Sequence, residues 1–417
     1  MTTKVFLGTQ EIVSYVLKNK PLGIERLVSE NTISAINGKS VICLDGITAL
    51  GSGVLCCAYY NNTSLTELPD FSNIETVEKY GLYSCFDGCT NVTGQLDFSS
   101  LTNITGDSAF YNAFINCSNI TGHLDLSSCE TITGNMACYN AFNNCSGITS
   151  VDLHNLRRID TYYSCNNMFS GCTGITGHLN LGSLTQITNC AYGCINMFGN
   201  CTGITSVDLH NLVTIQSNQN ACSNMFSGCT GIVSVDLRKL ENVSSPYSCT
   251  SMFSGCTSLR MFKFESVKQM NNYNTTFANI FQDCTSLTDV YFYALLSSNF
   301  SVGLAKTGLV NMLKNVTGCR VHFPKKLETI CSTLDDFING FGGTNTVISY
   351  ELVTSLTGND NNTYNRQEKD STSTAIAWNS SGILYYTNYT NGEPQVGDSI
   401  YSDESCTTVV TNINSIA

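Results

Sequence analysis

The sequence predicts an α/β repeat solenoid with a parallel sheet and short helices, followed by a small C-terminal β-module. A Phe-x-x-Cys pattern recurs at spacings of 27 to 29 residues, and an apolar–polar–apolar triplet such as Val235-Asp236-Leu237 follows each copy. Self-similarity at such a fixed period indicates stacked supersecondary units rather than one globular core. The recurring phenylalanines are Phe86, Phe114, Phe142, Phe169, Phe198, Phe226, Phe253 and Phe281.

Each repeat offers two apolar surfaces. Cys222, Phe226 and Cys229 stand at i, i+4 and i+7, which predicts one stripe of a short helix. The triplet alternates as a short strand does. Neither surface can be buried within a single repeat, so stacked copies must bury both. With one strand per repeat, the strands should form a parallel sheet.

The repeat units carry a family resemblance. The run from Met225 to Leu237, and the copies ending at Leu181, Leu209 and Phe264, resemble the BspA-like leucine-rich repeats of bacterial, protist and phage proteins. The resemblance covers about residues 56–325. It implies a curved solenoid that serves in adhesion or scaffolding. This chain departs from the family by its longer period and by an added glycine in the copies that reach Leu96, Leu124 and Leu179.

Composition narrows the class of partner. Charged residues make up 12% of the chain and the net charge is -12, which argues against binding to a phosphate backbone. The first residues do not form a signal peptide, and no apolar run is long enough to span a membrane. We therefore expect a chain that is made and folded in a cytoplasm.

Most of the 22 cysteines fall on two repeat positions. At one of these positions phenylalanine replaces cysteine in flanking copies, which suits buried packing better than pairing. We expect reduced core thiols, with disulfides or a metal ladder as alternatives. The first position holds Cys89, Cys117, Cys145, Cys172, Cys201, Cys229, Cys256 and Cys284, and the second holds Cys138, Cys165, Cys194, Cys222 and Cys249.

The chain divides into four predicted parts. Residues 1–26 form an N-terminal docking segment, whose Lys-Val-Phe-Leu-Gly-Thr-Gln-Glu-Ile run is similar to the openings of tailed-phage virion proteins. The alternative is a cap tucked onto the solenoid. Residues 27–340 form the solenoid with its caps, including helices expected over 302–316 and 325–338. Residues 341–374 form a linker, and 375–417 form a small β-module similar to those of gut-phage appendage proteins.

No catalytic constellation is evident. His154 and His210 stand in identical Val-Asp-Leu-His-Asn-Leu contexts, and a catalytic histidine is not expected in duplicate. The sequence also lacks the P-loop, the Rossmann fingerprint and the zinc-protease motif. We expect no enzyme activity and no cofactor.

One exposed strip is a candidate binding site. The middle residues of the triplets should line one sheet face, with Asn180 interrupting a row of aspartates. Like charges about 4.8 Å apart repel by roughly 0.9 kcal/mol in water. This cost favours a bound cation such as Ca²⁺, a basic partner or hydrogen-bonded neighbours, and the alternative is a solvated acidic strip. The row consists of Asp97, Asp125, Asp152, Asp208 and Asp236.

These observations favour a non-enzymatic structural or adhesion protein of a phage virion, in a tail or head appendage. Its expected partners are other virion proteins, bound through residues 1–26, and a host-surface protein or glycan. Nucleic acid and a membrane span are not expected, and the oligomeric state stays open. The alternatives are a bacterial or protist cell-surface adhesin and an intracellular protein-interaction scaffold.

Overall fold

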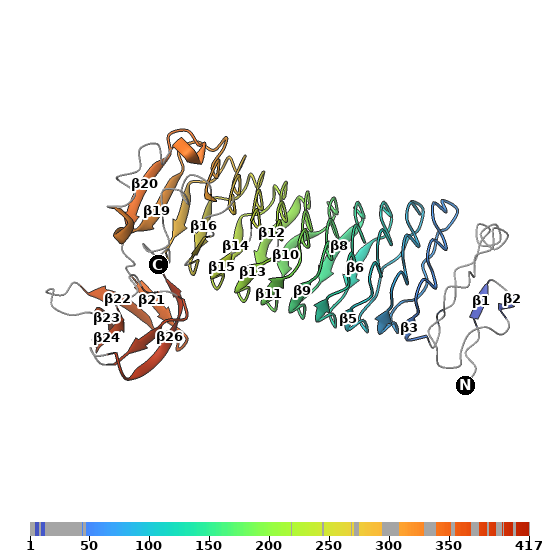
Figure 1. Ribbon diagram of the computed structural model, residues 1–417, viewed down its shortest axis with the longest axis horizontal. Helices are drawn as coiled ribbons and strands as arrows, with labels where there is room; N and C mark the ends of the chain where they lie inside the picture. Colours follow the sequence, from blue (N-terminus) through green and yellow to red (C-terminus); the bar gives the residue numbers. More distant parts are fainter. Residues whose placement is uncertain are drawn as a thin grey trace.

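The computed structural model shows a nearly straight, elongated solenoid that ends in a small β-barrel (Figure 1). The structure describes residues 5–7, 10–12, 44, 47–217, 219–243, 246–267, 269–270, 275–293, 308–328, 339–351, 355–367, 375–381, 383–388, 394, 396–402 and 406–416.

Nine very short strands form the longest sheet, which the sequence pattern does not predict. All neighbouring strands are parallel, and residues such as Ile132, Ile159 and Ile187 stack on one another in the core. A strand of two or three residues is too short to show the alternation by which strands are recognised. The strands are β3 (Ala49–Leu50), β4 (Thr76–Val77), β5 (Asn103–Ile104), β7 (Thr131–Ile132), β9 (Arg158–Asp160), β11 (Gln186–Thr188), β13 (Thr214–Gln216), β15 (Asn242–Val243) and β17 (Gln269–Met270).

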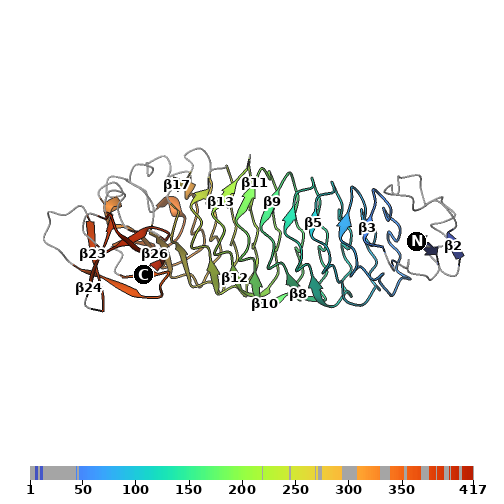
Figure 2. The same cartoon turned by 90° about the horizontal axis from the view of Figure 1, so that it is seen from below.

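The predicted triplet strands lie on the other side of the rod (Figure 2). They pair in parallel, so that Leu179, Val207 and Val235 are in register, which confirms the predicted parallel sheet. They form three shorter sheets, β6-β8, β10-β12-β14 and β16-β18-β19, and β20, which is not a predicted triplet strand, adds a fourth strand to the last sheet. Their bounds are β6 (Gly122–Asp125), β8 (Ile148–Asp152), β10 (Thr176–Asn180), β12 (Gly203–Asp208), β14 (Ser234–Asp236), β16 (Met261–Phe264), β18 (Asp289–Phe292), β19 (Arg320–Pro324) and β20 (Val347–Glu351).

The prediction of short helices is wrong. The Phe-x-x-Cys segments form a stack of turns, which we call the turn ladder, with one rung per repeat. In the rung around residues 134–145, Tyr139 N–H donates to the Met136 carbonyl three residues back (3.2 Å), and Asn140 N–H donates to the Asn166 carbonyl of the next rung (2.9 Å). Met136, Asn140 and Asn144 have φ of 52°, 51° and 60°. A right-handed helix excludes such values, whereas asparagine adopts them more readily than most residues.

The turn ladder imitates the sequence pattern of a helix. Ala137 and Cys138 are buried, Tyr139 and Asn140 are half-buried, and Ala141 and Phe142 are again buried. Two residues pointing in and two pointing out give a period of four. Apolar residues therefore recur at i, i+4 and i+7, as they do on a helix stripe.

The spacing between repeats explains why no helix can form there. The rings of Phe86 and Phe114 stack with centroids 5.1 Å apart, and those of Phe198 and Phe226 are 5.6 Å apart. Neighbouring strands are about 4.8 Å apart, whereas packed helices need 8–10 Å. Because this side advances almost as little per repeat as the strands do, the rod stays nearly straight rather than curving as the family resemblance implied.

The repeated cysteines are buried, and each repeat-position thiol of the first set contacts the rung before it. Cys117 Sγ donates to the Phe86 carbonyl (2.9 Å), and Cys145 Sγ donates to the Phe114 carbonyl (3.0 Å). The same contact recurs from Cys89 to Cys284. All twenty cysteines within the described residues are free thiols. The cysteines of the first set therefore pack in the core and each supply a weak donor to a carbonyl.

The extra glycines noted in three repeats form bulges. Gly94, Gly122 and Gly177 have φ of 111°, 85° and 79°. The strand register shifts at Gly122 and at Gly177. Glycine adopts such φ values without the cost that a Cβ imposes. An added residue is thereby absorbed without a change of register in the triplet that follows.

The C-terminal cap continues the solenoid. Leu309, Met312 and Leu313 are buried, and Phe281 N–H donates to the Met312 carbonyl (3.0 Å), as in the rungs before it. Asn311 and Asn315 again have positive φ. The described part of the helix expected over 302–316 is therefore another rung. Most of the helix expected over 325–338 lies outside the described residues, and the short 3-10 helices η1 (Lys325–Leu327) and η2 (Asn339–Phe341) flank that gap.

The barrel begins before the predicted β-module. Its strands are antiparallel and surround Leu356, Tyr364, Trp378 and Ile400. Two of the strands, together with β20, fall within the stretch 341–374 that we expected to be a linker. The Asn- and Thr-rich composition concealed them, because their inward residues are few. The strands are β21 (Ser355–Gly358), β22 (Thr363–Gln367), β23 (Ala375–Ser380), β24 (Ile383–Asn388), β25 (Ser399–Tyr401) and β26 (Val409–Ile416).

At the N-terminus, β1 (Val5–Leu7) and β2 (Gln10–Ile12) pair antiparallel within the predicted docking segment. The rest of residues 1–26 lies outside the described residues. The docking role of this segment stays a prediction.

Candidate binding surface

The predicted aspartate row lies on the outer face of the triplet strands. Asp97 and Asp125 are bridged in parallel, Asp125 is in register with Asp152, and Asp208 is in register with Asp236. Each of these side chains is half-buried, while the apolar residues on both sides of it point into the core. The structure thus brings the five predicted residues onto one face.

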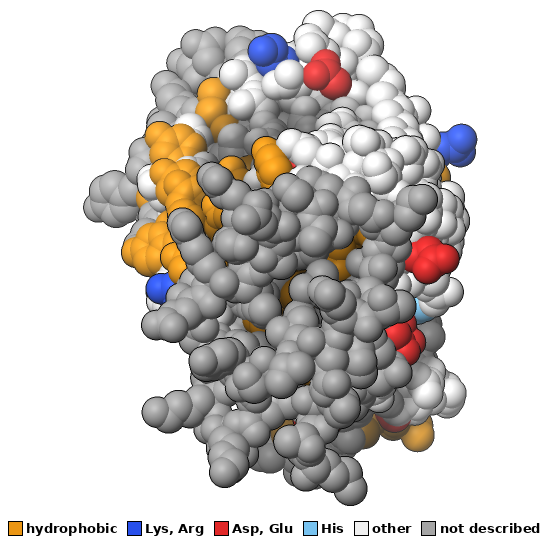
Figure 3. All heavy atoms as spheres, turned by 90° about the vertical axis from the view of Figure 1, so that its right-hand side faces the viewer, with side chains coloured by type: hydrophobic (Ala, Val, Ile, Leu, Met, Phe, Trp, Pro, Cys, Tyr) orange, Lys and Arg blue, Asp and Glu red, His pale blue; other side chains and the backbone are white. Residues whose placement is uncertain are grey.

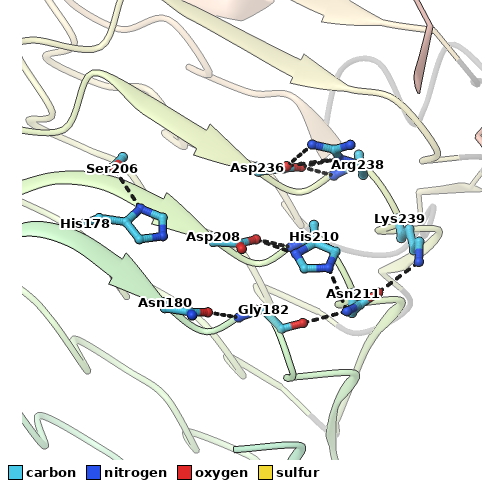
Figure 4. Close-up of polar contacts among 10 residues, drawn as sticks. All are labelled: His178, Asn180, Gly182, Ser206, Asp208, His210, Asn211, Asp236, Arg238 and Lys239. Carbon is cyan, nitrogen blue, oxygen red and sulfur yellow. Dashed lines mark hydrogen bonds and ion pairs between the residues drawn. The ribbon is translucent and has the colours of Figure 1, made fainter. Parts of the chain in front are cut away.

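Each carboxylate of the row closes the turn that ends its own strand. Asp125 Oδ1 accepts the N–H of Ser127 (2.8 Å), and Asp208 Oδ1 accepts the N–H of His210 (3.0 Å). Asn180 makes the same contact with Gly182 N–H (2.9 Å), as Figure 4 shows. Aspartate and asparagine are the side chains that form such turns. A local backbone requirement therefore accounts for the row, including its one asparagine.

Side chains two residues further along the chain contact three of these carboxylates. His154 Nδ1 lies 2.7 Å from Asp152 Oδ1, and His210 Nδ1 lies 2.7 Å from Asp208 Oδ1. Arg238 Nε lies 3.0 Å from both carboxylate oxygens of Asp236 (Figure 4). Each partner is two residues beyond its aspartate, on the turn that the aspartate closes. The charge of Arg238 thus offsets that of Asp236 within the chain.

The same contacts set the ionisation of the row. Partial burial raises the pKa of the Asp236 carboxyl, but the hydrogen bonds and charge of Arg238 outweigh this effect and hold that pKa below its usual range. The pKa of Asp152 is likewise lowered: burial opposes the shift, and hydrogen bonds from His154 overcome it. Both carboxylates stay ionised at neutral pH.

A second polar row, of histidines and serines, runs beside the first. His123 Nδ1 lies 2.9 Å from Ser150 Oγ, and His178 Nδ1 lies 2.9 Å from Ser206 Oγ on the neighbouring strand. The signal was present, because each histidine follows one of the bulge glycines. The pairing itself could not be predicted, because it joins residues 27 or 28 positions apart.

These two rows do not assemble a cage for a cation. Among the described residues, no three or more His, Cys, Asp or Glu side chains are grouped so that they could hold a metal ion. Calcium takes six to eight oxygen ligands. The row instead offers about one carboxylate per strand, with one oxygen already bound to a backbone N–H.

The repeats match a known family. A model described as "BspA type Leucine rich repeat region (6 copies)" matches residues 52–196 and 165–299, which together exceed half of the chain. The chain belongs to the BspA-type leucine-rich repeat family. This bears out the resemblance seen in the repeat sequence, although the matches are silent on a phage source.

The chain also shows a weak similarity to a solved structure. A solved structure titled "Crystal structure of TLR13-ssRNA13 complex" is 18% identical over 64% of this chain, with a TM-score of 0.19. The chain spans 42% of the length of that protein. No curated protein matches the sequence. Within the described residues, no helix is long and apolar enough to cross a membrane.

Proposed function

We propose that this BspA-type repeat protein is a non-enzymatic binding protein, whose solenoid presents its polar sheet face to a protein or to a surface that it adheres to. The regularity of the aspartate row supports this proposal. The same side-chain-to-backbone contact recurs on strand after strand, which fixes the side chains before a partner arrives. Such pre-organisation lowers the entropic cost of binding. Catalysis, in contrast, needs dissimilar groups that converge on one point.

The charge of this face changes along the rod, and this pattern indicates where a partner should carry basic side chains. Asp97, Asp125 and Asp152 follow one another at the N-terminal end, whereas Arg238 and Lys263 enter the face further along. A partner with basic side chains opposite the first three aspartates is complementary to this pattern. Charge pairs of this kind raise association rates and fix the orientation of a partner.

A finer proposal places the chain in a tail or head appendage of a tailed-phage virion, docked through residues 1–26. It rests on the resemblance of the opening and of the C-terminal run to virion proteins. The alternatives remain a cell-surface adhesin and an intracellular scaffold. The three proposals differ in where the chain is recovered.

Mass spectrometry of purified particles and of cell envelopes from the source distinguishes these locations. We expect the full chain to co-purify with virion proteins, and a chain without residues 1–26 to be lost from the particles. Recovery from the envelope alone would replace the virion proposal with the adhesin.

Substitutions on the aspartate row test the binding face itself. The triple variant Asp97→Asn, Asp125→Asn and Asp152→Asn keeps the strand-end turns, as Asn180 does, but removes three charges. We expect weaker, less salt-dependent binding to the partner recovered from the particles or envelope, measured by surface plasmon resonance. Glu75→Gln with Glu130→Gln, two exposed sites near the nine-stranded sheet, is the control, which removes two charges from a different face. Equal losses in both variants would contradict the proposed face.

A further inference from the structure

The outer side of the turn ladder differs in chemistry from the rest of this acidic chain. Six consecutive rungs contain no Asp, Glu, Lys, Arg or His, although the chain as a whole carries a net charge of -12. We call the outward side chains of these rungs the neutral face. The rungs comprise residues 108–116, 135–144, 162–171, 191–200, 219–228 and 246–255.

Tyrosines form a column along the neutral face. The rings of Tyr111 and Tyr139 are stacked with centroids 5.0 Å apart, and those of Tyr163 and Tyr192 are 4.8 Å apart. Tyr139 and Tyr163 join the two halves edge to face at 6.2 Å. Tyr83, one rung before the face, extends the column by stacking on Tyr111 at 4.8 Å.

Several large side chains on this side are strongly exposed. Met136 is 38% exposed, Tyr162 is 48% and Tyr247 is 40%. Figure 3, which views the rod from its N-terminal end, shows hydrophobic side chains, tyrosine included, gathered along one edge. Large exposed hydrophobic side chains that gather on one side of a protein can mark an interaction site.

The hydrogen-bonding groups of this face are uncharged, and each can both donate and accept a hydrogen bond. Tyrosine and serine hydroxyls and asparagine amides both donate and accept, whereas a carboxylate only accepts and a lysine only donates. Asparagines also stack between rungs: Asn140 Nδ2 donates to Asn112 Oδ1, and Asn144 Nδ2 donates to Asn116 Oδ1, both at 3.0 Å. Because the stacked tyrosine rings cover one another, they offer ring edges and hydroxyls rather than open ring faces. The best complement is a ligand that is itself uncharged and rich in hydroxyls.

The repetition of the face selects the shape of that ligand. The same groups recur about every 5 Å along a nearly straight line, as neighbouring strands do. A linear polymer presents equivalent groups along its whole length, so it can contact successive rungs in the same way. Weak contacts repeated along a polymer add up through effective concentration.

We propose that the neutral face binds an extended, uncharged polysaccharide. The polymer lies along the rod across the tyrosine column, and its hydroxyls exchange hydrogen bonds with the tyrosine and serine hydroxyls and the asparagine amides. Anionic polymers are disfavoured, because the net charge of the chain repels them and the face supplies no cation to pair with them. The inference rests on the proposed binding role but uses a face separate from the aspartate row.

Affinity electrophoresis of the full chain in native gels tests this proposal. The gels contain dextran, mannan, starch, galactan or mixed-linkage β-glucan, and alginate serves as the anionic polymer. We expect slower migration in at least one neutral polysaccharide and unchanged migration in alginate. The triple variant Tyr83→Phe, Tyr111→Phe and Tyr139→Phe keeps the ring stack but removes three hydroxyls. It should bind the retarding polysaccharide about fivefold more weakly for each hydroxyl that bonds to it.

The control is the triple aspartate variant Asp97→Asn, Asp125→Asn and Asp152→Asn, which should migrate in the polysaccharide gel as the parent does relative to its mobility in a plain gel. Retardation by none of the neutral polymers, or retardation that the phenylalanine variant leaves unchanged, overturns the proposal. A different result is that the parent chain binds no polysaccharide but self-associates in sedimentation, and that the phenylalanine variant abolishes this self-association. This result would assign the face to a second copy of the chain. Loss of partner binding in the aspartate variant concerns the proposed function alone.

Discussion

At the scale of single residues, Cys145 shows what a cysteine contributes to each rung. Its side chain is fully buried, and its Sγ lies 3.0 Å from the Phe114 carbonyl of the rung before it. The thiol thus fills a small apolar space and also supplies a donor. Substitution of Cys145 by alanine or by serine distinguishes these two roles.

We expect Cys145→Ala to lower the free energy of unfolding by about 1–2 kcal/mol, because a buried group and a hydrogen bond are lost together. Cys145→Ser keeps a donor for the carbonyl and should cost less than alanine. Thermal and urea unfolding of the two variants measure this order. If serine proves more destabilising than alanine, the thiol serves only as an apolar group.

Cys56 is a thiol of a different kind, because it lies partly exposed at the start of the turn ladder. Its Sγ is 3.8 Å from that of Cys57, and the side-chain hydrogen bond between the two thiols lowers the pKa of Cys56 to about 7. Burial raises the pKa of the Cys145 thiol well above its usual value. The two classes of thiol should therefore differ in reactivity.

We expect iodoacetamide to label Cys56 at a rate that rises as pH increases through about 7, with the buried thiols unlabelled in the folded chain. Peptide mass spectrometry after short reactions at several pH values measures this profile. Cys57→Ala removes the donor and should move the midpoint upward, while Cys57→Ser keeps a donor and should move it less. A profile indifferent to both substitutions would show that Cys57 does not stabilise the thiolate.

At the scale of the element, two glycines near β10 serve different purposes. A Cβ on Gly174 would lie 2.3 Å from the Ser146 carbonyl oxygen of the previous repeat. Gly177 has open space around its Cα but a φ of +79° at the strand bulge. The first glycine allows two repeats to approach, and the second allows the chain to bend.

We expect Gly174→Ala to cost about 1–3 kcal/mol, because backbone atoms of the neighbouring repeat must move. Gly177→Ala should cost about 1–2 kcal/mol, because a Cβ is unfavourable at positive φ. Urea unfolding midpoints of the two variants give the comparison. A larger loss at position 177 would mean that the bulge, rather than repeat spacing, limits the stability of this strand.

At the scale of the whole molecule, the solenoid and the barrel have separate hydrophobic cores. The single tryptophan, Trp378, is fully buried in the barrel, where its Nε1–H donates to Thr387 Oγ1 (2.8 Å). Solenoid stability is a sum over repeats and their interfaces, so it need not follow that of the barrel. Tryptophan emission should report the barrel alone.

We expect urea unfolding curves from tryptophan fluorescence and from far-ultraviolet circular dichroism to have different midpoints, because most of the backbone signal comes from the solenoid. Trp378→Phe should abolish the fluorescence transition and leave the main dichroism transition in place. Coincident curves would indicate that the two cores unfold as one unit.

The repeat, the burial of its phenylalanines and cysteines, and the strands of the triplets can all be predicted from the sequence. These features follow from local alternation and a fixed period, which a single chain displays directly. The sequence also placed Asp97, Asp125, Asp152, Asp208 and Asp236 on one outer face. The prediction of a short helix at Cys222, Phe226 and Cys229 was wrong. A ladder with two residues pointing in and two pointing out shares the i, i+4, i+7 spacing of a helix.

Whether these residues form a helix or a ladder of turns depends on how neighbouring repeats pack. Strands and stacked phenylalanine rings must advance together by about 5 Å per repeat, and a helix is too wide to do so. The nine-stranded sheet, the His123–Ser150 contact and the tyrosine column also join residues about one repeat apart. Such contacts exist because whole repeats stack, which is a property of the assembled rod and not of any one segment.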